Sequence, residues 1–160
     1  MRHENEVNSA IENYSDMLRR ICFINLKNHH DVEDIFQDVF LKYALSETEF
    51  TDSNHEKAWV IRVAINSCKD LKKSFFRRKV GSINEEIFSP FSLDESDRDV
   101  LGAVLRLPHK YMIVIYLFYY EGYSAVEIAE MLEKNENTVY TWLARARKML
   151  EGELRGDILE

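Results

Sequence analysis

Cations gather in the middle of the chain. Six lysines and arginines fall between residues 69 and 79, opposed there only by Asp70. They are Lys69, Lys72, Lys73, Arg77, Arg78 and Lys79. The helix dipole favours cations in the last turns of a helix, but six exceed that need. Phe75 and Phe76 lie among them, so this stretch indicates contact with a nucleic acid or another polyanion.

A second stretch, residues 123–150, has the pattern of a DNA-binding helix-turn-helix. A short apolar helix precedes the polar residues 133–137, and a longer helix follows with an apolar face at helical steps. That face consists of Val139, Leu143, Ala146 and Leu150. The other face would reach base edges and phosphates, although many paired helices only build a core. It carries Asn137, Thr138, Tyr140, Thr141, Trp142, Arg145, Arg147 and Lys148.

No arrangement of side chains in the sequence indicates catalysis, a metal or a cofactor. Cys22 and Cys68 lack the CxxC spacing of metal or redox sites, so we expect reduced thiols. The adjacent His29 and His30 do not share a helix face. Neither a bilayer-spanning run nor a signal-peptide core is present. We expect a cytoplasmic protein that is not an enzyme, with no cofactor, no metal, no small-molecule substrate and no membrane insertion.

Three helices are expected in the first half of the chain, at residues 4–28, 32–44 and 55–76, because apolar residues recur there at helical steps. Asp31 is expected to cap the second helix by accepting hydrogen bonds from its free backbone N–H groups. The polar loop before the third helix contains Phe50. Its ring either folds back onto the core or stacks on an unpaired base.

The second half begins with expected helices at residues 100–107 and 110–120. The second of these is apolar enough for a strand, but its apolar face fits a buried helix better. Gly122 suits the position just past its end. Ser124 should cap the next helix, with Glu127 completing a capping box, and Asn135 should cap the last helix.

Residues 81–99 differ in composition from the helices around them. They are rich in serine and acidic residues and show no persistent period, which predicts a flexible tether. The 160-residue chain has only 2 prolines and 5 glycines, which favours long helices. We therefore predict an all-α fold of two small helical domains, residues 1–80 and 100–160, joined by a flexible linker. The second domain is the helix-turn-helix.

Several motifs, in order, resemble the bacterial sigma factors of the extracytoplasmic-function group, in the sigma-70 family. Residues 31–40, DVEDIFQDVF, are similar to the family's D-A-E-D-L-x-Q-E-V-F helix. Residues 58–66, AWVIRVAIN, followed by Asp70, resemble its A-W-L-x-R-I-A-x-N…D segment. Further short matches in the second half agree in order and spacing. These are Leu107-Pro108, EGYS at 121–124, EIA at 127–129, Thr138-Val139 and RARK at 145–148.

The resemblance implies a factor that directs RNA polymerase core to promoters and helps to open them. The first domain would dock on the β′ clamp helices and read the −10 element as a single strand. The second would read the −35 element as duplex, with the β flap as a further contact, and an anti-sigma factor is an expected partner. The implied polymerase-binding residues are Asp34, Gln37, Asp38 and Phe40. The implied single-strand contacts are Phe50, Asn54, Asn66, Lys69, Lys72 and Lys73. Phe50 and Asn66 fall where the family lines a pocket for a flipped-out base.

The sequence departs from the family in the helix-turn-helix. Glu133 stands where the turn usually has Gly, and a positive φ there would strain Glu by about 1 kcal/mol. Tyr140, Trp142 and Ala144 stand where the family often has Lys, Arg and a His or aromatic residue. The recognition surface is thus less cationic than usual. The net charge of −7 fits a protein for which polymerase supplies most of the positive field.

Two other functions stay open on the sequence. A stand-alone helix-turn-helix regulator would bind duplex DNA without polymerase. A sigma-like interaction protein would bind polymerase or another partner without reading promoters.

Overall fold

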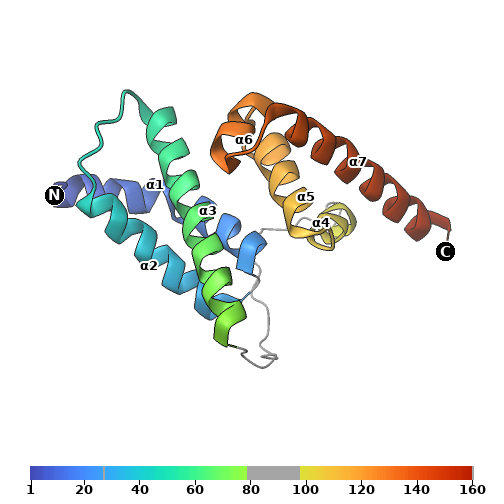
Figure 1. Cartoon of the computed structure of the whole chain (residues 1–160), viewed down its shortest axis with the longest axis horizontal. Coiled ribbons are helices and arrows are strands. Elements are labelled where there is room, and N and C mark those ends of the chain that lie inside the picture. Colours follow the sequence, from blue (N-terminus) through green and yellow to red (C-terminus); the bar gives the residue numbers. More distant parts are fainter. Residues whose placement is uncertain (27, 79–97, 160) are drawn as a thin grey trace. The chain divides into compact units, whose positions relative to one another are not determined.

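A computed structural model describes residues 1–26, 28–78 and 98–159 (Figure 1). All regular secondary structure in these ranges is helical, which confirms the predicted all-α fold. Within the helices, only the backbone is described at 74–78, 98–101 and 155–159. The chain divides into two compact units, one on each side of a boundary between residues 91 and 92.

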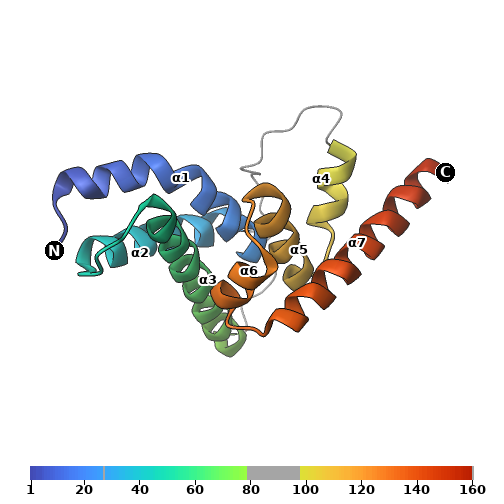
Figure 2. The same cartoon turned by 90° about the horizontal axis from the view of Figure 1, so that it is seen from above.

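The N-terminal unit is a bundle of three helices, α1 (Glu4–Leu26), α2 (His29–Leu45) and α3 (Ser53–Arg78). Each helix packs against the other two, and the two views in Figures 1 and 2 show them side by side. The core comes from residues at helical steps, which places apolar surface away from water. Its fully buried members include Leu18, Ile21, Val39, Ile61 and Ile65.

The starts of α2 and α3 differ from the prediction. Asn28, not Asp31, caps α2: its side chain accepts a hydrogen bond from the Asp31 N–H at 3.1 Å, so the helix begins at His29. At α3, Asp52 accepts a hydrogen bond from the His55 N–H at 2.8 Å, so the helix begins two residues earlier than expected. Asn54, predicted in the loop, therefore lies in the first turn of α3.

The fold brings the two cysteines together, although they are far apart in the sequence. Cys22 of α1 and Cys68 of α3 are both fully buried and both free. A hydrogen bond that the Cys22 thiol donates to Cys68, together with burial, raises the pKa of Cys22 well above its ordinary value. Both effects favour the neutral thiol, which behaves here as a small apolar core residue.

The C-terminal unit is built around its last helix. α7 (Glu136–Leu159) packs against α4 (Arg98–Leu105), α5 (His109–Ile115) and α6 (Ala125–Leu132). Val139, Leu143 and Ala146 of α7 are buried as predicted, and Leu150 is half-buried. α6 and α7 form the expected helix-turn-helix.

Local hydrogen bonds fix the ends of these helices as predicted. The Ser124 hydroxyl accepts from the Glu127 N–H at 3.2 Å, and the Glu127 carboxylate accepts from the Ser124 N–H at 3.0 Å. The capping box is therefore complete. The Asn135 side chain accepts from the Thr138 N–H at 3.2 Å and so caps α7. Gly122 has φ 79°, a conformation that glycine adopts without strain.

The apolar run 110–120 is helical, not a strand, but it changes type halfway. α5 ends at Ile115, and a single π-helical turn, η1 (Tyr116–Tyr120), follows. Tyr116 and Leu117 stay in the core, whereas Tyr119 is 59% exposed. π-turns inside helices are rare, and sequence periodicity does not reveal them.

The turn between α6 and α7 is a Schellman motif. The Lys134 N–H donates to the Ala129 carbonyl at 2.9 Å, and the Glu133 N–H donates to the Glu130 carbonyl at 3.3 Å. Glu133 takes the left-handed conformation, with φ 55° and ψ 43°. Glu133 thus has the positive φ that the sequence analysis considered for this position, where the turn usually has Gly.

Most of the predicted linker, up to residue 97, lies outside the described residues. Its last two residues, Arg98 and Asp99, are not linker but the first turn of α4.

Candidate nucleic-acid interface

The eight predicted duplex contacts on α7 fall into two groups according to their position around the helix. At 100° per residue, Asn137, Thr141, Arg145 and Lys148 lie opposite the buried stripe of α7. All four are exposed. This outward stripe, defined by these four residues, presents an amide, a hydroxyl and two cations. Such groups hydrogen-bond base edges and bind phosphates.

The other four predicted contacts lie at the flanks of that helix. Thr138 is half-buried and Tyr140 is 53% exposed. Trp142 is also half-buried, and the Lys110 ammonium of α5 lies 5.6 Å from its ring centroid. Arg147 is exposed, but its Nε donates to the Tyr119 hydroxyl at 2.5 Å. Trp142 and Arg147 therefore already contact their own unit.

Phe50 folds back onto the N-terminal unit, which was one of the two alternatives that the sequence left open. Its ring is nearly parallel to that of Tyr43, with centroids 6.1 Å apart. The Trp59 ring meets it edge-on at 5.8 Å, and the His55 ring does so at 5.3 Å. Because Phe50 remains half-buried rather than buried, part of the ring still faces solvent.

The Glu56 carboxylate accepts hydrogen bonds from two tyrosine hydroxyls beside this aromatic cluster. The Tyr14 hydroxyl donates to Glu56 Oε1 at 2.8 Å, and the Tyr43 hydroxyl donates to Oε2 at 2.9 Å. Burial, together with the hydrogen bond to Glu56, raises the pKa of Tyr43 to about 12. The neutral phenol is thus favoured across the physiological range.

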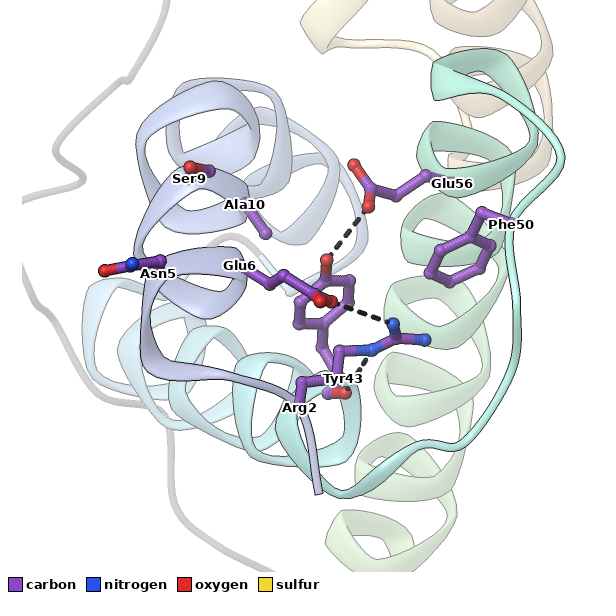
Figure 3. A pocket seen from close by; sticks show the side chains of 8 residues that line it. All are labelled: Arg2, Asn5, Glu6, Ser9, Ala10, Tyr43, Phe50 and Glu56. Atoms are coloured by element: carbon purple, nitrogen blue, oxygen red, sulfur yellow. Dashed lines mark hydrogen bonds and ion pairs between the residues drawn. The ribbon is translucent and has the colours of Figure 1, made fainter.

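A cavity of about 430 Å³ opens beside these rings (Figure 3). Its walls come from the beginning of α1, the end of α2, the loop that carries Phe50 and the beginning of α3. The residues that line it are Arg2, Asn5, Glu6, Ser9, Ala10, Tyr43, Phe50 and Glu56. The cavity combines two aromatic rings with hydrogen-bonding groups, which is a composition that suits a planar polar ligand.

The remaining predicted single-strand contacts run along α3. Asn66, Lys69 and Lys73 follow one another at steps of three and four, so they share a face of the helix. Asn66 and Lys69 are half-buried, and Lys73 is exposed. The same spacing places Trp59 at the head of this face, beside Phe50. Lys72, half-buried, lies to one side, and Asn54 is exposed in the first turn.

Only part of the predicted basic cluster is described. The side chains of Arg77 and Arg78, together with Lys79 as a whole, lie outside the described residues, as do the rings of Phe75 and Phe76.

The predicted polymerase-binding residues occupy the exposed face of α2, with one exception. Asp34 and Gln37 are exposed, and the Asp38 carboxylate pairs with Lys42 at 2.9 Å. Phe40 is only 6% exposed, and its ring packs edge-on against Phe36 at 4.9 Å. Phe40 therefore belongs to the core in this structure, which argues against a direct contact of its ring with polymerase.

Two residues beside Phe50 were missed by the sequence interpretation as members of the site. Trp59 was read only as part of a family motif, although its position one turn after the helix start would have placed it near the loop. Arg2, which lies against the Phe50 ring, carries no signal, because it precedes the periodic part of α1.

Within the described ranges, no group of three His, Cys, Asp or Glu residues is arranged to hold a metal ion. No helix in those ranges is long and apolar enough to span a membrane.

Comparison with known proteins matches both units. Residues 10–79 match the family described as Sigma-70 region 2, and residues 97–150 match Sigma-70, region 4. The RNA polymerase sigma factor SigV of Bacillus subtilis is 30% identical over 152 residues, covering 91% of this chain and 89% of SigV. The ECF RNA polymerase sigma factor SigW of the same organism is 27% identical over 162 residues, covering 91% and 87%.

Solved structures have the same fold. The sigma factor RpoE in its complex with the anti-sigma factor NepR from Bartonella quintana gives a TM-score of 0.68 at 19% identity, covering 94% of this chain and 97% of that one. CnrH in its complex with the cytosolic domain of CnrY gives 0.63 at 19% identity, covering 97% and 91%.

The chain therefore belongs to the sigma-70 family of RNA polymerase sigma factors, in the extracytoplasmic-function group. Proteins of this family are not enzymes; they direct RNA polymerase to promoters.

Proposed function

We propose a division of this promoter-directing function between the two units of the chain. The exposed face of α2, with Asp34, Gln37 and Asp38, binds the clamp helices of polymerase. The Phe50 cluster, which consists of Phe50, Tyr43, His55 and Trp59, and the α3 face that follows it along the helix hold the −10 element as a single strand. The outward stripe of α7 reads the −35 element as duplex. The protein acts in the cytoplasm, where polymerase and promoters are, and has no catalytic activity of its own.

The observation that carries this proposal is the continuity of the α3 face. An aromatic cluster at its head is followed along one side of the helix by Asn66, Lys69 and Lys73. Aromatic rings stack on unpaired bases, amides hydrogen-bond base edges, and ammonium groups bind the backbone phosphates. Those three chemistries are needed together only when the DNA strands have separated, so they favour a factor that takes part in promoter opening.

Charge supports a requirement for polymerase. The chain carries a net charge of −7, and free DNA binding depends mainly on phosphate neutralisation. The outward stripe of α7 contributes only Arg145 and Lys148. We therefore expect the protein to bind promoter duplex weakly alone and tightly as part of a holoenzyme, in which the polymerase supplies most of the positive field.

Run-off transcription with purified core polymerase tests this function. Genomic DNA fragments are transcribed with core alone and with core plus the protein, and the new 5′ ends are mapped. We expect transcripts that appear only with the protein and share sequence elements upstream. Gel shifts with those promoters, with and without core, complete the test. Tight duplex binding by the protein alone would favour a stand-alone regulator. Core binding without any promoter-dependent transcript would favour an interaction protein.

An anti-sigma factor is a further proposed partner. RpoE and CnrH, which share this fold, are each solved in complex with another protein, and that partner of RpoE is an anti-sigma factor. Pull-down on the full chain, with core polymerase as a competitor, tests whether a partner binds the surfaces that polymerase uses.

A further inference from the structure

Arg2 joins the beginning of the chain to the loop that carries Phe50. Its Nε donates a hydrogen bond to the Tyr43 carbonyl, at the end of α2, at 3.0 Å. Its Nη2 donates to the Thr48 carbonyl, inside the loop. Its Nη1 lies 3.4 Å from Glu6 Oε2 (Figure 3). The side chain is only 11% exposed, so this guanidinium is largely removed from water by the groups that it binds.

The same guanidinium lies over two aromatic rings. Its Cζ is 4.7 Å from the ring centroid of Phe50 and 4.7 Å from that of Tyr43. The two rings are within 8° of parallel, and their centroids are 6.1 Å apart. Both Cζ–centroid distances lie within the range of a cation–π contact.

We propose that Arg2 is a positioning residue for the single-strand reader. It holds the Phe50 loop closed before DNA arrives, by bonding one carbonyl on the helix before the loop and one carbonyl within it. A loop ordered in advance does not lose conformational freedom when it captures a base. The inference rests on the proposed function of the Phe50 cluster.

Arginine is suited to this position in a way that lysine is not. A planar guanidinium donates in two directions while its face stacks on a ring, whereas an ammonium is a compact point charge. The backbone N–H of Arg2 separately donates to the Ala44 carbonyl at 2.9 Å. Removing the side chain should therefore leave the chain end in place and release only the loop.

Helix α1, which follows Arg2, provides a control. Arg19 of α1 stacks on the Phe36 ring, with Cζ 4.2 Å from the centroid, and its Nε lies 3.2 Å from Glu33 Oε1. It thus combines a cation–π contact with an ion pair, as Arg2 does, but it joins α1 to α2 away from the loop. Arg19→Ala removes one ion pair and one cation–π contact, fewer contacts than Arg2→Ala removes, without touching Phe50.

Hydrogen exchange of the free, full-length protein tests the hold on the loop. Any affinity tag is placed at the C-terminal end. We expect the amides of residues 46–52 to exchange at least tenfold faster in Arg2→Ala than in the wild type, with Arg2→Lys in between and Arg19→Ala unchanged there. Equal loop exchange in Arg2→Ala and the wild type would overturn the proposal.

Promoter opening tests its consequence. Core polymerase with each variant is mixed with a promoter mapped by run-off transcription, and strand separation is followed by 2-aminopurine fluorescence at the −10 element. We expect about tenfold slower opening for Arg2→Ala, equivalent to about 1.4 kcal/mol, with partial recovery in Arg2→Lys and unchanged core affinity. Equal slowing by Arg19→Ala would show a general loss of stability and overturn the proposal. If the wild-type protein itself opens no promoter, the proposed function is wrong. Faster loop exchange in Arg2→Ala would in that case still show that Arg2 orders the loop.

Discussion

Glu133 offers a test of how the helix-turn-helix is held together. It occupies the left-handed position of the Schellman motif between α6 and α7, with φ 55°. A left-handed conformation costs a residue with a Cβ about 1–2 kcal/mol, and glycine avoids this cost. Glu133 is exposed and stands at the C-terminal end of α6, where its negative charge opposes the helix dipole. Glu133→Gly should therefore stabilise the C-terminal unit.

The expected gain is the difference between two opposing effects. Relief of the backbone strain contributes about 1–2 kcal/mol. Glycine also makes the unfolded chain more flexible, which offsets about 0.4–1 kcal/mol of that gain. The net stabilisation is then about 1 kcal/mol, which raises the Tm of a unit of this size by about 4–8 °C. Glu133→Gln is the matched control, because it removes the charge and keeps the strained backbone.

The two tryptophans make this measurement specific to one unit. Trp59 lies in the N-terminal unit and Trp142 in the C-terminal unit. In a Trp59→Phe background, tryptophan fluorescence during urea unfolding reports the C-terminal unit alone. A Glu133→Gly protein no more stable than Glu133→Gln would refute the reasoning, because it would mean that the left-handed conformation costs nothing measurable at this turn.

Four further substitutions test the proposed DNA contacts and the hydrogen bonds that stabilise the two units. Arg145→Ala should weaken −35 recognition by about 1–3 kcal/mol, measured as holoenzyme affinity for −35 variants, because it removes a side chain that we propose reads bases. Asn66→Ala should slow promoter opening while leaving core binding intact, measured by strand-separation kinetics and by core titration. Ser124→Ala should cost the C-terminal unit about 1 kcal/mol in urea unfolding, because it breaks the capping box. Tyr43 has a folded pKa of about 12 against an ordinary 10, so its contribution to stability is present below pH 10 and is lost as pH rises toward 12. Tyr43→Phe should flatten the loss of stability in that window, followed by Trp59 fluorescence in a Trp142→Phe background.

Each of these has an outcome that contradicts it. Unchanged transcription from every −35 variant would mean that Arg145 does not read bases. Loss of core binding in Asn66→Ala would make Asn66 structural. An unchanged midpoint in Ser124→Ala would mean that the box adds nothing to the turn. An unaltered pH profile in Tyr43→Phe would mean that another group titrates between pH 10 and pH 12.

The sequence predicted those parts of the fold that local chemistry determines. Period and capping residues gave the helix-turn-helix, its Ser124 box and its Asn135 cap, because these hydrogen bonds join residues only three apart. The sequence failed where two residues competed for one role. Asn28 and Asp31 both suit a helix N-cap, and no rule of composition chooses between them.

The contacts of the site were harder to predict, because they join distant parts of the chain. Arg2 meets Phe50 across almost fifty residues, and Cys22 meets Cys68 in the same way. The resemblance implied Phe40 as a polymerase contact, yet its spacing from the other apolar residues of the same helix already placed it on the apolar face. The motif correctly indicated a helix at residues 31–40, and the packing decides which of its side chains reach the surface.

α6 is closed at both ends by its own hydrogen bonds, with the capping box before it and the Schellman turn after it. These hydrogen bonds fix the first and last residues of α6. They therefore also fix the angular position around the helix axis of each residue of α7. One residue added within the first turn of α7 would rotate everything beyond it by about 100° and turn the outward stripe toward the core. On the proposed reading of the −35 element by this stripe, promoter specificity would therefore change through substitutions at Asn137, Thr141, Arg145 and Lys148 rather than through insertions or deletions.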